Sequence, residues 1–321
     1  MKIKDQEYSI YTIPLLSIVC ITYNHVDFIK DAIESFLNQD VDFFVEILIH
    51  DDASDDGTNL IIAEYEKRYP LIIKPIYQKI NQHSISGFEF SFRELQRAQG
   101  KYIALCEGDD YWIDNNKLEK QVNFLENNLD YVFCFHNSFC FDQNIKSNTV
   151  EFPGIKENSD FIIDDFLIKN NVPTASVIFV REFLLPLPNW HKNILYGDYG
   201  MYLLTLFRSK RKAFYMSEVM SVYRLHNNGV FTSLTRSNSG KIKISNNFIE
   251  LYKYFYYNVF DKIYKKRVRD IISYHHLSII ILFLRNKMFF KGIKFIFYFF
   301  VFNPFYIVRK IKAILKKKYN L

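Results

Sequence analysis

Short apolar runs alternate with helically spaced apolar positions along the first 125 residues of the chain. Residues 15–22 form a near-continuous apolar run rich in β-branched side chains, which is typical of a strand buried on both faces of a parallel sheet. Residues 28–37 then repeat apolar side chains at helical spacing. Further apolar runs occupy residues 45–50, 72–77 and 102–106, with helical patterns between them. This alternation predicts an α/β domain with a mainly parallel sheet flanked by helices.

Polar side chains follow several of these predicted strands at the point where each strand ends. They are Tyr23, the pair Asp51 and Asp52, and the cluster Glu107, Asp109 and Asp110. Open parallel sheets bind ligands outside the carboxyl ends of their strands, so these side chains are expected to face one crevice. A cluster of carboxylates suits Mg²⁺ or Mn²⁺, which leave coordination positions open for phosphates. The cluster alone could be an Asp-rich turn bent at Gly108, but a second acidic strand end favours a binding site.

The composition indicates a folded chain that lacks a low-complexity linker. Of its 321 residues 49% are hydrophobic and 18% aromatic, with 10 Gly and 8 Pro, and this length suits one large domain or two. The four cysteines have no Cys-x-x-Cys spacing, which argues against a zinc site and a disulfide framework and favours a reduced, cytoplasmic setting. Residues 1–14 mix Lys, Asp and Glu without an apolar core, so neither a signal peptide nor a membrane anchor is expected there.

Charge divides the chain into two unequal parts. Residues 241–321 contain 18 Lys and Arg against 3 Asp and Glu, a balance of +15, whereas residues 1–240 have 23 against 32, a balance of −9. The C-terminal part is also rich in Phe and Tyr, but its apolar run at residues 295–302 is too short for a spanning helix of ~20 residues.

Two interpretations of this C-terminal part remain open. It could be a basic aromatic helix in the membrane interface, with residues 310–318 against anionic headgroups. Alternatively, it could be a helical subdomain packed on the core with a solvated basic face. No nucleic-acid partner is expected, because no recognition module accompanies the charge.

Three stretches of the sequence resemble the signature stretches of family 2 glycosyltransferases with the GT-A fold, in both order and spacing. They are residues 17–24 (SIVCITYN), 47–58 (ILIHDDASDDGT) and 100–112 (GKYIALCEGDDYW). The resemblance implies a Rossmann-like nucleotide-diphospho-sugar transferase with a mixed, mainly parallel sheet. We therefore expect a catalytic domain over residues 1–240 and a helical extension over residues 241–321. The nucleotide-sugar-binding half would cover about residues 14–125, and the acceptor half residues 126–240.

The resemblance implies a role for the residues at the first two strand ends. Tyr23 would stack on the nucleobase, with Thr22 and Asn24 beside it in the nucleotide-sugar site. Asp52 would bind the base or the ribose, and Asp109 would contact the sugar or the ribose. The same resemblance favours a UDP-sugar as donor.

The metal site is also implied by the resemblance. Asp110 would ligate the Mn²⁺ or Mg²⁺ that bridges the donor diphosphate, with Asp109 as a second ligand. The family's Asp-x-Asp motif appears here as Glu107-Gly-Asp109-Asp110, which leaves open which of the three acids touches the metal. His226 lies in a stretch similar to the family's Tyr-Arg-x-His-x-x-Gly and would be a further ligand or a phosphate contact.

The second half of the expected catalytic domain has weaker signals. Residues 117–125 read as an amphipathic helix and residues 131–135 as a strand; residues 141–160 are polar and Asn-rich, which indicates a loop over the site. Residues 172–180 read as a strand of small residues, suited to the wall of a sugar pocket. Residues 227–234 would close over the donor. The alternative to a metal or phosphate contact by His226 is that Arg224 and His226 only stabilise a turn.

Asp198 opens the next helical pattern and is the candidate catalytic base. Alone, an Asp at this place is more often a cap stabilised by the helix dipole. In the resembled family an acid here deprotonates the acceptor hydroxyl. An inverting transfer needs such a carboxylate on the face opposite the leaving nucleotide.

Together these features predict a metal-dependent, inverting glycosyltransferase. It would move a sugar from a nucleotide donor to a glycan or lipid-linked acceptor during assembly of a bacterial surface polysaccharide such as capsule, O-antigen or exopolysaccharide. We expect it in the cytoplasm, with the inner membrane face as a further location. One alternative is a catalytically silent nucleotide-sugar-binding protein. A sugar nucleotidyltransferase is less favoured, because no Gly-rich phosphate loop with a basic residue follows the first strand.

Overall fold

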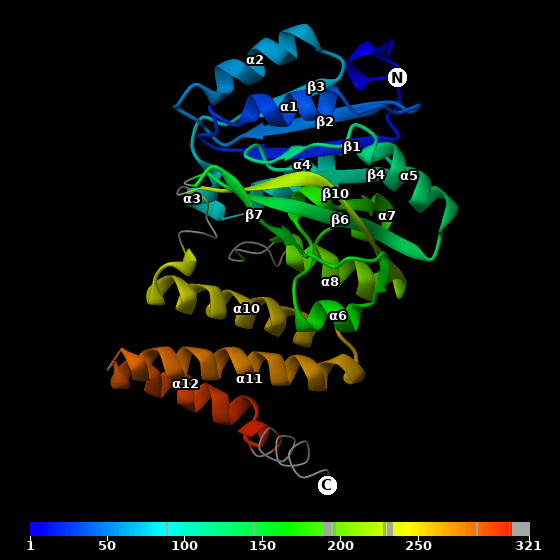
Figure 1. Cartoon of the computed structure of the whole chain (residues 1–321). Coiled ribbons are helices and arrows are strands. Elements are labelled where there is room, and N and C mark those ends of the chain that lie inside the picture. Colours follow the sequence, from blue (N-terminus) through cyan, green and yellow to red (C-terminus); the bar gives the residue numbers. More distant parts are fainter. Residues whose placement is uncertain are drawn as a thin grey trace. The chain divides into compact units, whose positions relative to one another are not determined.

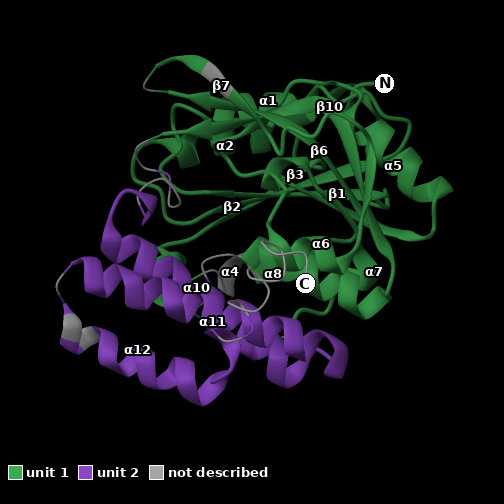
Figure 2. Ribbon diagram, turned by 60° about the horizontal axis from the view of Figure 1, so that its bottom comes forward, with its two compact units in different colours: residues 1–193, 197–226 green, residues 194–196, 227–321 purple. Residues whose placement is uncertain are grey.

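Two compact units make up the chain in the computed structural model (Figures 1 and 2). The structure describes residues 1–87, 89–143, 145–188, 194, 197–226, 229, 234–286, 288–307 and 309. The first unit comprises residues 1–193 and 197–226, and the second comprises residues 194–196 and 227–321. The division therefore falls after residue 226, whereas the sequence pattern placed the expected domain boundary at residue 240.

The described part of the first unit contains one ten-stranded sheet. Its strands are β1 (Leu16–Thr22), β2 (Val45–Asp51), β3 (Ile73–Tyr77), β4 (Tyr102–Leu105), β5 (Tyr111–Trp112), β6 (Tyr131–Asp142), β7 (Ser147–Phe152), β8 (Ser159–Phe161), β9 (Ile178–Val180) and β10 (Lys212–Leu225). Their order is β3-β2-β1-β4-β9-β6-β10-β5, with β7 paired to β6 and β8 to β10. β1 pairs in parallel with β2 and β4, and β6 with β10, whereas β9 runs antiparallel to both its neighbours. The predicted mixed, mainly parallel sheet is confirmed.

Helices and short helical turns connect the strands. They are η1 (Ile3–Asp5), α1 (Ile29–Leu37), α2 (Thr58–Arg68), α3 (Gln82–Ser86), α4 (Glu89–Arg97), α5 (Lys117–Asn127), α6 (Ile163–Ile168), η2 (Thr174–Ser176), α7 (Arg181–Leu184) and α8 (Gly197–Ser209). α1 buries Ile29, Ile33 and Phe36 in the core against strands β1 and β2. This packing explains the helical spacing of its apolar residues. The parallel pairing of β1 with β4 places the loops after these two strands at the same edge of the sheet.

Two sequence-based expectations about the second half of this unit were wrong. Residues 141–160 are not one loop, because β6 continues to Asp142 and β7 returns antiparallel to it. The polar composition that suggested a loop instead belongs to a strand at the margin of the sheet, where one face is solvated. Residues 172–180 are not one strand either. Ser176 donates its backbone N–H to Pro173, so a helical turn precedes the three-residue strand β9.

The described part of the second unit is helical. It contains α10 (Asn238–Asn258), α11 (Lys262–Arg285) and α12 (Phe289–Phe302). α11 packs against both α10 and α12. Side chains cap the first two helices: the Ser237 hydroxyl accepts from the Gly240 N–H, and the Asp261 carboxylate accepts from the N–H groups of Ile263 and Tyr264. Among the described helices, none has the length and apolar character needed to cross a bilayer.

Candidate active site

The loops after β1 and β2 are joined by hydrogen bonds that hold Tyr23 in place. The backbone N–H of Asn24 donates to the Ser54 hydroxyl over 2.9 Å, and the Asp55 N–H donates back to the Asn24 side-chain oxygen over 3.0 Å. The His25 N–H donates to the Thr58 hydroxyl over 2.8 Å. Asn24 has a φ of 53°, a left-handed conformation that Asn tolerates better than most residues. Tyr23 remains 44% exposed on this braced loop, so its ring is accessible to a ligand.

Gly108 allows the acidic turn after β4 to approach the end of β1 closely. A Cβ atom at this position would lie 2.6 Å from the Thr22 hydroxyl oxygen, closer than real contacts allow. The Gly108 N–H donates to the Ile21 carbonyl over 2.9 Å. Thr22 is only 1% exposed, so its side chain lies beneath this turn. Thr22 therefore supports the acids around Gly108, and its contact with the nucleotide stays a prediction.

The structure brings Glu107, Asp109 and Asp110 together with two histidines. One carboxylate oxygen from each acid lies within 4.8 Å of the others, and so do ligand atoms of His25, Asp109 and His226. His226 Nε2 is 2.9 Å from Asp109 Oδ2, and His25 Nε2 is 3.7 Å from the same oxygen. The predicted metal ligands Asp109, Asp110 and His226 are thus adjacent. His25 was missed by the sequence analysis, although it follows directly on Tyr23 and Asn24.

The electrostatics of the acidic cluster favour a cation. Burial, together with the charge of Asp109, raises the pKa of Glu107 to about 8, and burial beside both neighbours raises the pKa of Asp110 well above its usual value. Burial also acts to raise the pKa of Asp109, but His25 and His226 lower it overall. Within the described residues Asp109 Oδ1 and Asp110 Oδ2 accept no hydrogen bond. Buried oxygens without donors fit a divalent ion of the Mg²⁺ or Mn²⁺ type.

Arg224 connects the acidic turn to the end of β10 and to α1. Its backbone N–H donates to Asp110 Oδ1 over 2.8 Å, and its guanidinium donates to the Asp109 carbonyl over 2.9 Å and to the Asp31 carboxylate. The guanidinium lies 4.2 Å from the ring centroid of Tyr111 and 5.2 Å from that of Phe28. Arg224 therefore does more than stabilise a local turn, because it bonds to the Asp110 carboxylate and to the backbone of Asp109.

Asp52 is turned toward the protein interior. It is 1% exposed, and its two carboxylate oxygens accept the backbone N–H groups of Gln82 over 2.6 Å and His83 over 3.0 Å. Burial acts to raise its pKa, but His50 and these donors lower it overall. In this arrangement Asp52 holds the start of α3 next to the loop after β2. A contact with the base or ribose stays a prediction.

Asp198 lies in the first turn of α8, as the sequence pattern predicted. The Thr174 hydroxyl donates to its Oδ2 over 3.4 Å. Burial raises the pKa of Asp198, which makes the carboxylate a better proton acceptor near neutral pH. Its charge in turn contributes to the raised pKa of Glu107, so the two carboxylates share one electrostatic environment. Most of residues 227–234, the expected donor-covering loop, lie outside the described residues.

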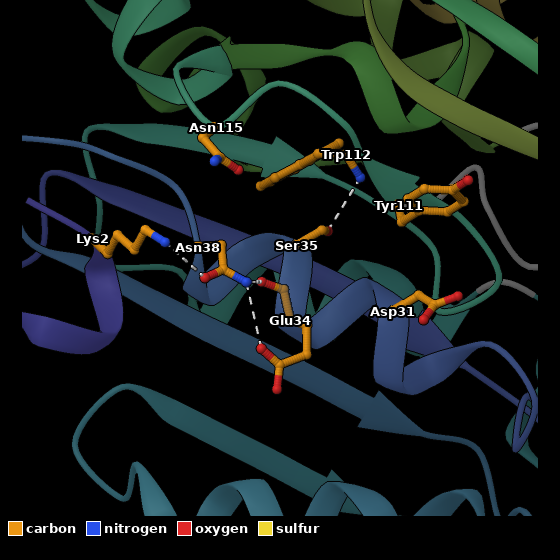
Figure 3. Close-up of a pocket in the computed structure, with 8 residues that line it drawn as sticks. All are labelled: Lys2, Asp31, Glu34, Ser35, Asn38, Tyr111, Trp112 and Asn115. Atoms are coloured by element: carbon orange, nitrogen blue, oxygen red, sulfur yellow. Dashed lines mark hydrogen bonds between the residues drawn. The ribbon is translucent and has the colours of Figure 1, made fainter.

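Two further features lie close to this cluster. Lys117 is fully buried, with its Nζ atom 4.1 Å from the Trp112 ring centroid, and burial lowers its pKa to about 7. An open hollow of about 540 Å³ is lined by Lys2, Asp31, Glu34, Ser35, Asn38, Tyr111, Trp112 and Asn115 (Figure 3). None of the predicted site residues lines it. Two of its lining residues, Asp31 and Tyr111, contact Arg224, which in turn bonds to the acidic cluster.

Comparisons with known proteins identify relatives over this part of the chain. The sequence model of "Glycosyl transferase family 2" matches residues 17–181. An uncharacterized protein of Mycobacterium tuberculosis is 36% identical over 228 residues, which cover 68% of this chain and 61% of the relative. The putative teichuronic acid biosynthesis glycosyltransferase TuaG of Bacillus subtilis is 29% identical, with 68% of this chain and 81% of TuaG covered. The matched region thus spans less than two thirds of the mycobacterial relative's length.

Two solved structures have a similar fold. Residues 1–349 of TarS of S. aureus, in complex with UDP-GlcNAc, superpose with a TM-score of 0.54 at 12% identity, covering 86% of this chain and 89% of that TarS fragment. The mannosyltransferase PcManGT of Pyrobaculum calidifontis, in complex with GDP-Man and Mn²⁺, gives a TM-score of 0.56 at 14% identity, with coverages of 87% and 75%. At such low identity these likenesses establish the fold alone.

Proposed function

The chain belongs to glycosyl transferase family 2, and we propose that it transfers a sugar from a nucleotide-sugar donor to a glycan or lipid-linked acceptor, inverting the anomeric centre. The observation that carries this proposal is the carboxylate cluster in which Asp109 and Asp110 each have a buried oxygen without a donor among the described residues, and whose Glu107 feels the charge of Asp198. A silent binding protein would have little use for a buried carboxylate with a raised pKa beside the donor site.

The acidic cluster would hold the donor diphosphate through a metal. Asp109, Asp110 and His226 would ligate Mn²⁺ or Mg²⁺; Asp109 lies within 4.8 Å of Glu107 and Asp110 in one possible ligand group, and of His25 and His226 in another. The metal would supply positive charge to the departing nucleoside diphosphate. Tyr23 would stack on the base, with Asn24 and Asp52 holding the two loops around it. The donors named for TarS and PcManGT contain uridine and guanosine respectively, so a UDP-sugar is only the first donor to test.

Asp198 would act as the catalytic base. Its carboxylate would accept the proton of the acceptor hydroxyl while that oxygen forms a bond to the anomeric carbon. The bond from this carbon to the diphosphate oxygen would break on the opposite face, which inverts the configuration. TuaG is named for teichuronic acid biosynthesis, which supports assembly of a surface polysaccharide as the setting. We place the reaction in the cytoplasm, where it would reach lipid-linked acceptors at the inner membrane face.

A donor panel tests this proposal. The full chain would be incubated with UDP- and GDP-sugars and Mn²⁺, and release of nucleoside diphosphate would be followed with and without EDTA. We expect release with one donor and its loss in EDTA. Asp198→Asn should bind that donor with unchanged affinity but transfer sugar about 10²- to 10⁴-fold more slowly. Binding without release by the parent chain would support the silent alternative, and release of pyrophosphate would support a nucleotidyltransferase.

A further inference from the structure

A row of large apolar side chains on α12 faces solvent. Phe290 is 90% exposed, Ile293 56%, Phe297 63% and Val301 66%. Their spacing of three, four and four residues places them on one face of the helix. Phe300, 51% exposed, flanks them. We call these five residues the α12 stripe; it is a contiguous apolar surface of the kind that soluble proteins rarely leave uncovered without a partner.

The opposite face of α12 is already packed. Phe299 is 2% exposed and forms a buried cluster with Ile280 and Tyr306, with Phe295 packed against it. A Cβ atom at Gly292 would lie 3.5 Å from the Phe283 side chain, so the helix backbone comes close to α11 there. α12 therefore meets α11 with its inner face, and the α12 stripe is additional apolar surface.

Hydrogen bonds at the C-terminal end of α12 prevent the helix from rotating about its axis so that the stripe would face α11. The buried Asn303 side chain donates to the Asp270 carboxylate over 2.9 Å and to the Ser273 hydroxyl over 3.0 Å. Arg309 donates to the same carboxylate and to the Asn303 side-chain oxygen. These bonds join the end of α12 to the middle of α11. The two helices run next to each other in Figure 1. Rotating the helix would break them and leave buried polar groups without partners.

The charge around the stripe identifies its partner. Residues 262–321 contain 15 Lys and Arg and a single acid, Asp270, which is paired with Arg309. Lys294 is exposed at the border of the stripe. A second copy of the chain on this surface would bring like charges together, whereas an anionic lipid surface complements them. A 14-residue helix is about 21 Å long, shorter than the ~30 Å hydrocarbon layer, so it would lie in the membrane plane.

We propose that the α12 stripe docks on an anionic lipid bilayer, with its Phe side chains at the boundary between headgroups and acyl chains. Lys294 at its border contacts the headgroups, whereas residues 310–318, the basic segment expected there, lie outside the described residues. This inference does not depend on the catalytic proposal, because it rests on the second unit alone. Of the two interpretations of the C-terminal part it favours the membrane interface: α10 to α12 pack against one another, and the last helix keeps an outward apolar face.

Vesicle flotation with the full chain tests the docking surface. We expect flotation with vesicles of phosphatidylglycerol and phosphatidylcholine, and much less with phosphatidylcholine alone. The triple variant Phe290→Ser, Phe297→Ser, Val301→Ser should lower the partition coefficient by at least about tenfold. The control replaces three equally exposed residues of the first unit, Ile10, Ile13 and Leu60, with Ser and should bind like the parent. Equal binding by both triple variants would overturn the proposal, as would a parent chain that stays unbound at low salt.

A fluorescence measurement supplies a second readout that does not depend on stability. Phe297→Trp adds a reporter to the stripe above the background of Trp112 and Trp190. Brominated phosphatidylglycerol vesicles should quench this added emission, while Tyr257→Trp, at a 65% exposed position of α10, should show less quenching. Vesicle binding without quenching of the tryptophan added to the stripe would exclude the stripe as the docking surface.

If the triple variant instead dissociates a dimer, the partner is a second copy and the lipid proposal is wrong. Donor hydrolysis without vesicles is measured in parallel, so a failed docking test and a failed catalytic proposal are distinguishable.

Discussion

The acidic turn after β4 and the α12 stripe depart from the usual distribution of side chains in opposite directions. In the turn, Asp110 is fully buried and carries a carboxylate oxygen with no donor among the described residues. In the stripe, Phe290 and Phe297 expose most of their apolar surface. Both arrangements cost free energy in the isolated protein. The comparison teaches that both regions fit a partner outside the chain, and our two proposals assign a cation with a diphosphate to the turn and a lipid surface to the stripe.

The largest effect is expected from Asp110→Asn. The amide oxygen can still accept the Arg224 N–H, but the negative charge is lost, so we expect kcat/KM for donor turnover to fall by about 10³-fold. In EDTA the same variant should unfold at a higher temperature than the parent, because repulsion within the buried cluster is reduced. Steady-state kinetics and thermal melts measure the two effects. Asp130→Asn, an exposed acid of the same unit, is the control; a parent-like kcat/KM in Asp110→Asn would show that the turn does not hold the reacting diphosphate.

Arg224→Lys tests whether the acidic turn must be held in one geometry. A lysine cannot donate to both Asp31 and the Asp109 carbonyl while lying against Tyr111, so the turn should loosen. We expect a 10- to 100-fold loss of kcat/KM, mostly in kcat, with a weaker apparent affinity for Mn²⁺. The matched control is Arg211→Lys, an exposed arginine 4.6 Å from the Phe183 ring centroid. If both variants lose activity equally, the role of Arg224 is general stability.

The second unit should be sensitive to acid through His275. Burial and the neighbouring His276 lower its pKa to about 4, and its ring stacks on Phe248 at 4.9 Å. An unfolded histidine has a pKa of ~6.5, so the stability is complete above that pH and is lost as the pH falls toward 4. At pH 5 the loss of stability is about 2 kcal/mol for His275, and burial lowers the pKa of His276 to about 4 as well, so it acts in the same direction. Amide protection factors for residues 262–285 at pH 7 and pH 5 measure it.

A double variant isolates the histidine contribution. His275→Gln with His276→Gln should have lower stability at pH 7 but a flatter dependence on pH, because no ring then has to charge inside α11. An unchanged pH dependence would assign the acid sensitivity to carboxylates of the second unit such as Asp270. The acidic turn of the first unit serves as the contrast. Its amide protection factors should change when Mn²⁺ is added, whereas those of α11 should not.

Much of the first unit could be predicted from local sequence. The near-continuous apolar run of β1 follows from a strand covered on both sides, and six of its seven residues are indeed buried. The acids after β4 and Asp198 at the start of α8 are encoded by short-range patterns of strand end and helix start. Such features depend on neighbours in sequence, which is why the three ordered stretches sufficed to indicate the family.

Other features depended on contacts between distant segments. His25 joins the acidic cluster because the loop after β1 lies beside the turn after β4, and Arg224 joins it because β10 ends beside the same turn, about 115 residues away in sequence. The inward orientation of Asp52 requires α3, and the strand β7 requires β6 as a partner. In α12 the composition alone showed an apolar, basic segment, but packing against α11 decided which apolar residues are left outside. Sequence thus determined the elements and their chemistry, whereas the tertiary structure decided which side chains meet and which remain exposed, because those outcomes depend on long-range packing.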